Sequence, residues 1–182
     1  MILHPFIGSA DLINPNFTVS ADLRWRGNIL AADYILKGPW QNVRHLKTCG
    51  LVHKRAHHLW KTTCFEWFLK PISSESYWEA NFSSDGNWNL YYLEGYRKNL
   101  IEENRVASVQ IQCKIVDDQW RMSTEVDLTS LALAPGTRFL SHLSAVIETV
   151  DDQKSYWSLI HSQQQPDFHH PHHFSLEIQK ES

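Results

Sequence analysis

Apolar and polar residues alternate with a period of two along much of this chain, which is the pattern of β-strands that bury one face. The alternation is clearest in residues 106–115 and 120–127, where apolar positions are separated by Ser, Gln, Arg and Glu. Residues 17–26 and 29–37 predict a strand pair, and residues 174–178 predict a last strand. The pattern therefore predicts a protein built mainly of β-strands.

Turn-forming residues separate these runs, and helical periodicity is scarce. Asp, Gly, Asn and Ser gather at residues 83–87, and two aspartates stand at 151–152. Residues 128–133 could form one short helical turn after Asp127, which is a suitable N-cap. We predict an all-β fold, a jelly-roll-like antiparallel β-sandwich that forms one domain over residues 1–182. The predicted core residues are Phe65, Trp67, Trp78, Phe82, Val109 and Ile111.

Composition limits the partners of this domain. The 182 residues carry 17 Lys and Arg against 20 Asp and Glu, so the basic surface that nucleic acid requires is absent. The sequence has no apolar run of about 18 residues that could span a membrane. The N-terminus lacks the basic and apolar regions of a signal peptide. We therefore expect neither nucleic acid nor membrane as a partner.

The cysteines suggest a reducing environment. Cys49, Cys64 and Cys113 form no Cys-x-x-Cys pair. Cys64 and Cys113 lie in apolar strand patterns, where a reduced, buried thiol is expected. We predict three free thiols, no disulfide and a cytoplasmic location.

Residues 58–97 carry the strongest functional signal, because eight Trp and Tyr residues gather there over three predicted strands. Glu66, Asn87, Asn89 and Arg97 lie among these aromatic residues. A sugar ring packs its apolar face on an aromatic ring, and its hydroxyls bond to carboxylates and amides. The stretch therefore indicates sugar recognition.

Alternation also assigns the side chains of these strands to two faces. Phe65 and Trp67 share one face, and we expect them in the core together with Trp78. Glu66 points to the opposite face, with Trp60 at the entry to it. A buried carboxylate that is satisfied by other protein groups is an equally good interpretation of Glu66.

Several motifs follow one another along nearly the whole chain. Residues 59–69 read Leu-Trp-x-x-Thr-Cys-Phe-Glu-x-Phe-Leu, and residues 77–86 read Tyr-x-Glu-x-Asn-x-Ser-x-x-Gly. Further motifs lie at 120–127, 136–139, 156–159 and 166–174. In this order they resemble the family 9 carbohydrate-binding modules and the related DOMON-like domains, in particular the stand-alone bacterial DOMON-like proteins.

The resemblance implies a module that binds a sugar between two tryptophans and does not turn it over. Trp60 and Trp157 match those tryptophans, and Glu66 matches a glutamate that contacts the sugar. The polar contacts of the hairpin strand fall near Asn87 and Asn89, where some members carry an arginine that this chain lacks. The full predicted ligand site is Trp60, Glu66, Asn87, Asn89, Arg97, Trp157 and His161, with a mono- or oligosaccharide as ligand and no cofactor.

Three alternatives stay open. Other DOMON relatives bind haem or act as redox partners, for which this chain offers Met122 or a pair of histidines. Glu66, Asp167 and His169 could form the acid–base set of a hydrolytic enzyme. A divalent metal could bind at the histidine run of His169, His170, His172 and His173. The function that we favour is a non-catalytic, sugar-binding module.

Overall fold

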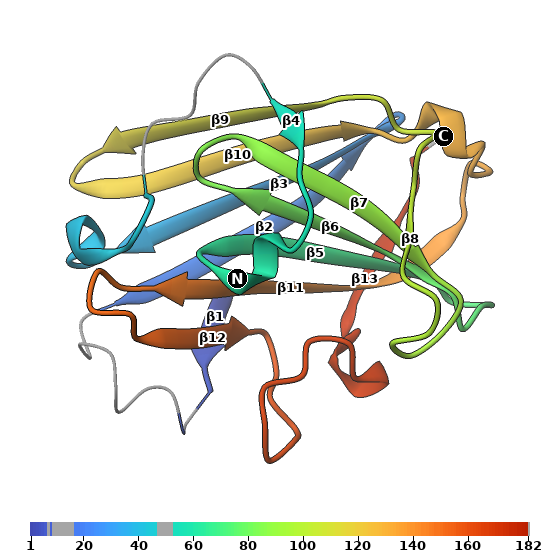
Figure 1. Ribbon diagram of the computed structural model, residues 1–182. Helices are drawn as coiled ribbons and strands as arrows, with labels where there is room; N and C mark the ends of the chain where they lie inside the picture. The colour runs from blue at the N-terminus through green and yellow to red at the C-terminus, as the bar shows by residue number, and fades with distance from the viewer. Residues whose placement is uncertain (7, 9–16, 47–52, 182) are drawn as a thin grey trace.

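The computed structural model describes residues 1–6, 8, 17–46 and 53–181, and its strands form a sheet that curls over on itself into two packed layers (Figure 1). In this part of the chain, no helix has the length and apolar character needed to cross a lipid bilayer. The first layer contains β1 (Ile2–Pro5), β2 (Thr18–Arg26), β3 (Ile29–Lys37), β10 (Gln119–Asp127) and β9 (Val109–Val116), in that spatial order.

The second layer provides the surface on which the candidate site is built. Its strands lie in the order β4 (Lys54–Arg55), β7 (Asn87–Leu93), β6 (Tyr77–Ser83), β5 (Cys64–Pro71), β11 (Arg138–Glu148) and β12 (Lys154–Ser158). Two short strands extend it: β8 (Ile101–Glu102) pairs with β7, and β13 (Leu176–Gln179) pairs with β11. Four 3-10 helices complete the described elements: η1 (Trp40–Asn42), η2 (Leu59–Lys61), η3 (Thr129–Leu131) and η4 (Pro171–His173).

The strand pairs follow the predicted pattern closely. β2 and β3 form an antiparallel hairpin in which Arg26 pairs with Ile29, and Gly27 takes a positive φ of 58° in the turn. The short turn predicted after Asp127 is present as η3, but its N-cap is Leu128, and Asp127 accepts a hydrogen bond from the backbone N–H of Thr129 at 2.8 Å. Among the described strands pairing is antiparallel, except that β4 runs parallel to β7. The predicted all-β sandwich is confirmed.

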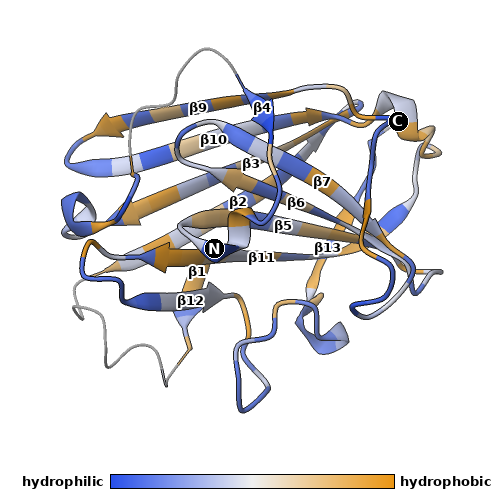
Figure 2. Ribbon diagram, viewed as in Figure 1, coloured by the Kyte–Doolittle hydropathy of each residue, from blue (hydrophilic) through white to orange (hydrophobic). Residues whose placement is uncertain are grey.

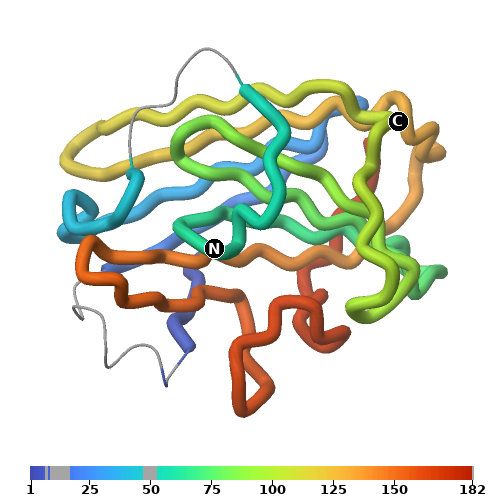
Figure 3. The backbone as a smooth tube through the Cα atoms, viewed as in Figure 1, coloured from blue at the N-terminus to red at the C-terminus, as the bar shows by residue number. Residues whose placement is uncertain are grey.

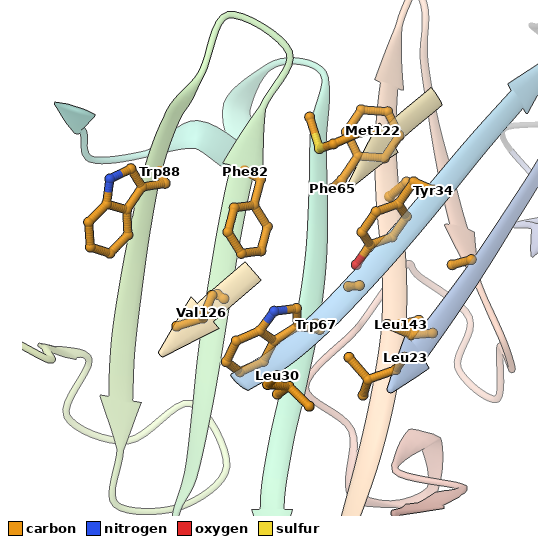
Figure 4. Packing of buried hydrophobic residues seen from close by; sticks show 14 of the residues in the cluster. Leu23, Leu30, Tyr34, Phe65, Trp67, Phe82, Trp88, Met122, Val126 and Leu143 are labelled. Atoms are coloured by element: carbon orange, nitrogen blue, oxygen red, sulfur yellow. The ribbon is translucent and has the colours of Figure 1, made fainter. Parts of the chain in front are cut away.

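The core lies between the two layers and is formed by apolar residues of the alternating strands. In Figure 2 hydrophobic and hydrophilic segments alternate along several of these strands. Phe65 stacks on Trp120 with ring centroids 5.0 Å apart, and Trp25 stacks on Phe139 at 5.2 Å. All six predicted core residues are buried. Figure 4 shows how side chains of the two layers meet, and it labels Leu23, Leu30, Tyr34, Phe65, Trp67, Phe82, Trp88, Met122, Val126 and Leu143.

A second apolar cluster lies on the outer face of the second layer. After β12 the chain leaves the sheet as a long irregular segment, residues 159–175, before it returns as β13 (Figure 3). Phe168 and Phe174 of this segment are buried against the outer face, where they pack near Phe68 and Tyr77. The outer face is therefore partly covered by protein, and a hollow remains beside the covering segment.

Candidate functional site

The hollow on the outer face is a cavity of about 450 Å³. Strands β5, β6, β11 and β12 form its floor, η2 stands on one side, and residues 166–169 of the covering segment stand on another. This volume falls in the range of small-molecule sites, which measure roughly 300–1,000 Å³. The cavity is therefore large enough for a ligand of one or two sugar rings.

Two buried glutamates form the polar part of the floor. Glu66 of β5 is 2 % exposed and Glu79 of β6 is 3 % exposed. In the register of the two strands Glu66 pairs with Asn81, which places Glu79 two residues away on the same face. Such diagonal neighbours lie roughly 7–8 Å apart along adjacent strands. Both carboxylates can therefore contact one ligand.

Each glutamate has one satisfied and one unsatisfied oxygen. Ser144 donates a hydrogen bond to Glu66 Oε2 at 3.0 Å, and Asn81 Nδ2 donates to Glu79 Oε1 at 2.8 Å. Glu66 Oε1 and Glu79 Oε2 are buried and have no hydrogen-bond partner in the protein. An unpaired buried acceptor costs free energy, so these two oxygens are positioned for donors that a ligand would bring.

Burial also changes the protonation of this pair. Burial, followed by the charge of Glu79, raises the pKa of Glu66 to about 8. Burial likewise raises the pKa of Glu79 to about 7, against the opposing hydrogen bond from Asn81. The pair therefore holds protons near neutral pH, and a ligand that favours the charged forms would displace them.

Aromatic side chains line the walls of the cavity. Trp60 stands on η2, which begins after His58 turns the chain with a left-handed φ of 61°. Its indole meets Tyr91 edge to face, with centroids 5.9 Å apart. Tyr156 of β12 also lines the cavity, and its ring lies 6.2 Å from that of Phe168. These rings give a ligand apolar surfaces beside the carboxylates.

His169 is held in place at the edge of the floor. Its Nδ1 lies 2.8 Å from the hydroxyl of Tyr77, which also accepts a hydrogen bond from the backbone N–H of Arg97. On the other side of the ring, His169 Nε2 lies 3.9 Å from Glu79 Oε2. Burial, followed by the charge of Arg97, lowers the pKa of His169 to about 4, so the ring is neutral at physiological pH.

The cations at the rim have partners of their own. The guanidinium of Arg97 donates to Asp167 at 2.8 Å, and Asp167 also accepts from the backbone N–H of His169 at 3.1 Å. Lys154 Nζ donates to the carbonyl of Lys61 and lies 3.7 Å from Glu148 Oε1. Neither Arg97 nor Lys154 forms an ion pair with a glutamate of the floor, although the charge of Arg97 lowers the pKa of Glu79.

The structure brings together three of the residues that the sequence predicted for the ligand site. Trp60, Glu66 and Arg97 all line the cavity. They come from η2, from β5 and from the loop between β7 and β8, and the fold gathers them on one face. The predicted partner tryptophan is not among them.

Trp157 points away from the cavity, so its predicted position has to be corrected. It is 5 % exposed and belongs to the core between the layers, where its Nε1–H donates to Ser155 at 2.7 Å. Its neighbour Tyr156 faces the cavity instead. Since side chains alternate along a strand, a one-residue error in phase moves a predicted contact to the opposite face.

The remaining predicted polar contacts do not line the cavity. Asn87 lies at the turn between β6 and β7, where it donates to Asp85 at 3.0 Å. Asn89 is fully buried and donates to Glu102 at 3.1 Å, in a network beside β4. His161 donates from Nε2 to a backbone carbonyl of β1 at 2.8 Å. All three have partners within the protein, which accounts for their polar character without a ligand.

The histidine run does not gather into a metal site. His169 lines the cavity, and the rings of His170 and His172 contact each other. His173 is buried and forms a hydrogen bond with the hydroxyl of Ser162. Over the residues that are described, no group of three or more His, Cys, Asp or Glu is arranged to hold a metal ion. The metal alternative therefore has no preformed ligand cluster in this part of the chain.

Met122 is the methionine that the haem alternative requires. It is fully buried in the core between the two layers (Figure 4). A haem could reach its sulfur only if the layers separated. Haem ligation by a histidine pair stays a prediction.

The prediction for the cysteines is wrong at one position. Cys64 is a free and fully buried thiol, as predicted, but Cys113 is disulfide-bonded. Cys49 lies outside the described residues. Cys113 sits on β9, the outermost strand of its layer, and apolar alternation gives no information on a bonding partner. The predicted cytoplasmic location rested partly on reduced thiols and stays a prediction.

Sequence reasoning missed Glu79 and Tyr156 as lining residues. Glu79 shares a strand face with Tyr77 and Asn81, so its face was evident, but its proximity to Glu66 depends on the register between two strands. Tyr156 directly precedes Trp157, and the resemblance assigned the ligand contact to Trp157. In both cases the missing information was the alignment between strands.

Solved structures of other proteins share this fold, although sequence comparisons find no match. No protein-family model matches the sequence, and no curated protein matches it either. A candidate carbohydrate-binding protein from Bacteroides uniformis ATCC 8492 matches in structure with a TM-score of 0.65 at 14 % sequence identity, over 91 % of this chain and 79 % of that one.

A family 9 carbohydrate-binding module from Caldicellulosiruptor kristjanssonii matches in two structures. The complex with glucose gives a TM-score of 0.54 at 13 % identity, over 93 % of this chain and 79 % of that one. The complex with cellotriose gives 0.55 at 14 % identity, over 93 % and 77 %. At these identities the likeness shows a shared fold: this chain has the β-sandwich architecture that is also found in family 9 carbohydrate-binding modules.

Proposed function

We propose that this protein binds a saccharide, with one sugar unit in the cavity on the outer face of the second layer. The observation that carries the proposal is the pair of unpartnered carboxylate oxygens, Glu66 Oε1 and Glu79 Oε2, in a cavity that Trp60 and Tyr156 also line. Sugar hydroxyls would supply the missing donors, and the C–H face of the ring would pack on an aromatic side chain. Structural neighbours that bind glucose and cellotriose support the proposal.

The site differs from the one that the family resemblance implied. Tyr156 takes the place proposed for the second tryptophan, and Glu79 takes the place proposed for the hairpin asparagines. His169 places its Nε2 at the same floor, 3.9 Å from Glu79 Oε2. The proposed contacts are therefore aromatic surface from Trp60 and Tyr156 and polar groups from Glu66, Glu79 and His169.

A saccharide panel tests the proposal. Isothermal calorimetry with mono- and disaccharides should find binding that Trp60→Ala and Glu66→Gln each weaken by about 1–3 kcal/mol, through lost contact area and an unpaired hydroxyl. Asn87→Ala is the matched control, because Asn87 lies outside the cavity and should leave affinity unchanged. Saccharide binding that none of the cavity variants alters would place the site elsewhere and reject the proposal.

Acid–base hydrolysis is a second candidate function, and the raised pKa values of the two glutamates favour it. Glycoside hydrolysis uses a pair of carboxyl groups, of which the acid has a raised pKa. Incubation with chromogenic aryl glycosides distinguishes the two functions. Binding alone predicts no release of the aryl group, whereas release that Glu66→Gln abolishes would establish the enzyme.

A further inference from the structure

Within the described part of the chain, the two glutamates on the floor of the cavity lack the Lys or Arg ion-pair partner that would hold them ionised, and burial keeps them protonated near neutral pH. Neither Glu66 nor Glu79 forms an ion pair with Lys or Arg among the described residues, and the neutral His169 ring is 3.9 Å from Glu79. Arg97 is paired with Asp167, at the rim. Two carboxylates with no counter-ion are costly to bury, since each ion loses its hydration.

The surroundings of the two carboxylates are adapted to a donor that reaches both. Glu66 Oε1 and Glu79 Oε2 are the unpartnered atoms, and their strands are directly paired. Cys64 Sγ donates to Asn81 Oδ1 at 3.5 Å, and Asn81 in turn donates to Glu79. The protein thus fixes one oxygen of each glutamate and leaves the other free. A compact cation with several N–H donors fits that arrangement better than a single hydroxyl does.

We propose that the bound sugar carries a protonated amine, and that this ammonium group lies between Glu66 and Glu79. The inference rests on the proposed saccharide site and names its ligand class as an amino sugar. The ammonium group would donate hydrogen bonds to both free oxygens and supply the missing positive charge. Charge-assisted hydrogen bonds of this kind are roughly twice as strong as neutral ones.

The titration of the pair gives the proposal a second signature. At neutral pH burial and mutual repulsion keep protons on the two glutamates. An ammonium group stabilises the ionised forms, so its binding should expel a proton, whereas a neutral sugar has no such requirement. The titratable groups that surround the pair are Tyr34, Lys61, Cys64, Tyr77, Tyr91, Arg97, Lys154 and His169.

Calorimetry with three matched sugars tests the inference. Glucosamine, glucose and N-acetylglucosamine differ at one position, and only the first carries a charge. At pH 6.5, below an ordinary α-amino pKa of about 8, the amine is protonated. We expect glucosamine to bind roughly tenfold more tightly than either neutral sugar. Titration in two buffers of different ionisation enthalpy should show release of roughly one proton per glucosamine bound.

Three variants show whether the glutamates are responsible. Glu66→Gln and Glu79→Gln keep the side-chain shape and remove the charge, so each should abolish the preference for glucosamine over glucose. Glu75→Gln removes an exposed carboxylate outside the cavity, and it should leave the preference intact.

A thermal-shift titration with calcium chloride alone tests whether the two carboxylates bind a metal ion instead. Calcium should not stabilise the wild-type protein any more than it stabilises Glu66→Gln.

The outcomes separate this inference from the proposed function. Equal affinity for glucose and glucosamine would overturn the inference and leave the saccharide site standing. Calcium stabilisation that Glu66→Gln removes would also overturn it, because the carboxylates would then hold a metal ion. Absence of binding for every saccharide tested, here and in the wider panel, would reject the proposed function and the inference together.

Discussion

Replacement of Glu66 by glutamine should make the protein more stable at alkaline pH. In the folded protein the pKa of Glu66 is about 8, against an ordinary value of 4.5. The native state therefore holds a proton that the unfolded chain releases between these two values. Stability should fall as pH rises through this window, by at most about 1.4 kcal/mol for each pH unit. Glu66→Gln removes that loss.

The magnitude follows from the same two values. The interval between 4.5 and about 8 corresponds to about 5 kcal/mol, at 1.36 kcal/mol for each pH unit. A comparison between pH 5 and pH 9 samples about three of these pH units, or about 4 kcal/mol, and the pH-independent cost of placing an amide beside Ser144 cancels from it. We expect the variant to gain about 2–4 kcal/mol relative to the wild type between pH 5 and pH 9.

Urea denaturation at pH 5, 7 and 9 measures this gain. The comparison is between the wild-type protein and Glu66→Gln, with Glu75→Gln as control because the Glu75 side chain is 84 % exposed. The titration of the histidines is common to all three proteins and cancels in the differences. A difference between Glu66→Gln and the wild type that stays constant from pH 5 to pH 9 would show that Glu66 is not held protonated by burial.

Three further predictions concern packing, acid stability and thiols. Trp157→Ala should cost about 3–5 kcal/mol of stability and leave saccharide affinity unchanged. Tyr156→Ala should weaken saccharide binding by about 1–2 kcal/mol at a smaller cost in stability. Denaturation and calorimetry on both variants check these two expectations. Burial lowers the pKa of His142 to about 3 and that of His169 to about 4, so stability should be fully present above pH 6.5 and decline as pH falls below it, which pH-dependent melting would show. Because Cys113 is disulfide-bonded, thiol titration of the denatured protein should detect fewer than three thiols before reduction and three afterwards.

The faces of the long strands could be predicted because their patterns are long. On β5 the alternation of Phe65 and Trp67 with Cys64 and Glu66 spans eight residues, so the phase is well defined. β12 has only five residues and contains a tyrosine beside a tryptophan. Either residue could face the core by hydrophobicity alone. The pairing of β12 with β11 and β1 decides the matter, and that information lies far away in the sequence.

The cavity depends on contacts that local pattern does not encode. Glu66 and Glu79 become neighbours through the register between β5 and β6. His169 comes from a segment about 90 residues later, and its place is fixed by the hydroxyl of Tyr77 (the two are separated by 92 positions). The sequence identified which strand faces could carry polar chemistry. It could not identify which polar groups would be left without partners, because that depends on all their neighbours together.

The four residues of β1 pair with strands of both layers, and this has a consequence for self-association. Ile2 and Leu3 pair with β2, while His4 and Pro5 pair with β12. An open strand edge offers unpaired N–H and C=O groups to any other chain, and it is a frequent starting point for aggregation. One short strand here closes two such edges at once. A change that detaches β1 would therefore expose two templates for intermolecular pairing, so damage to this small segment threatens solubility more than its modest share of the core would suggest.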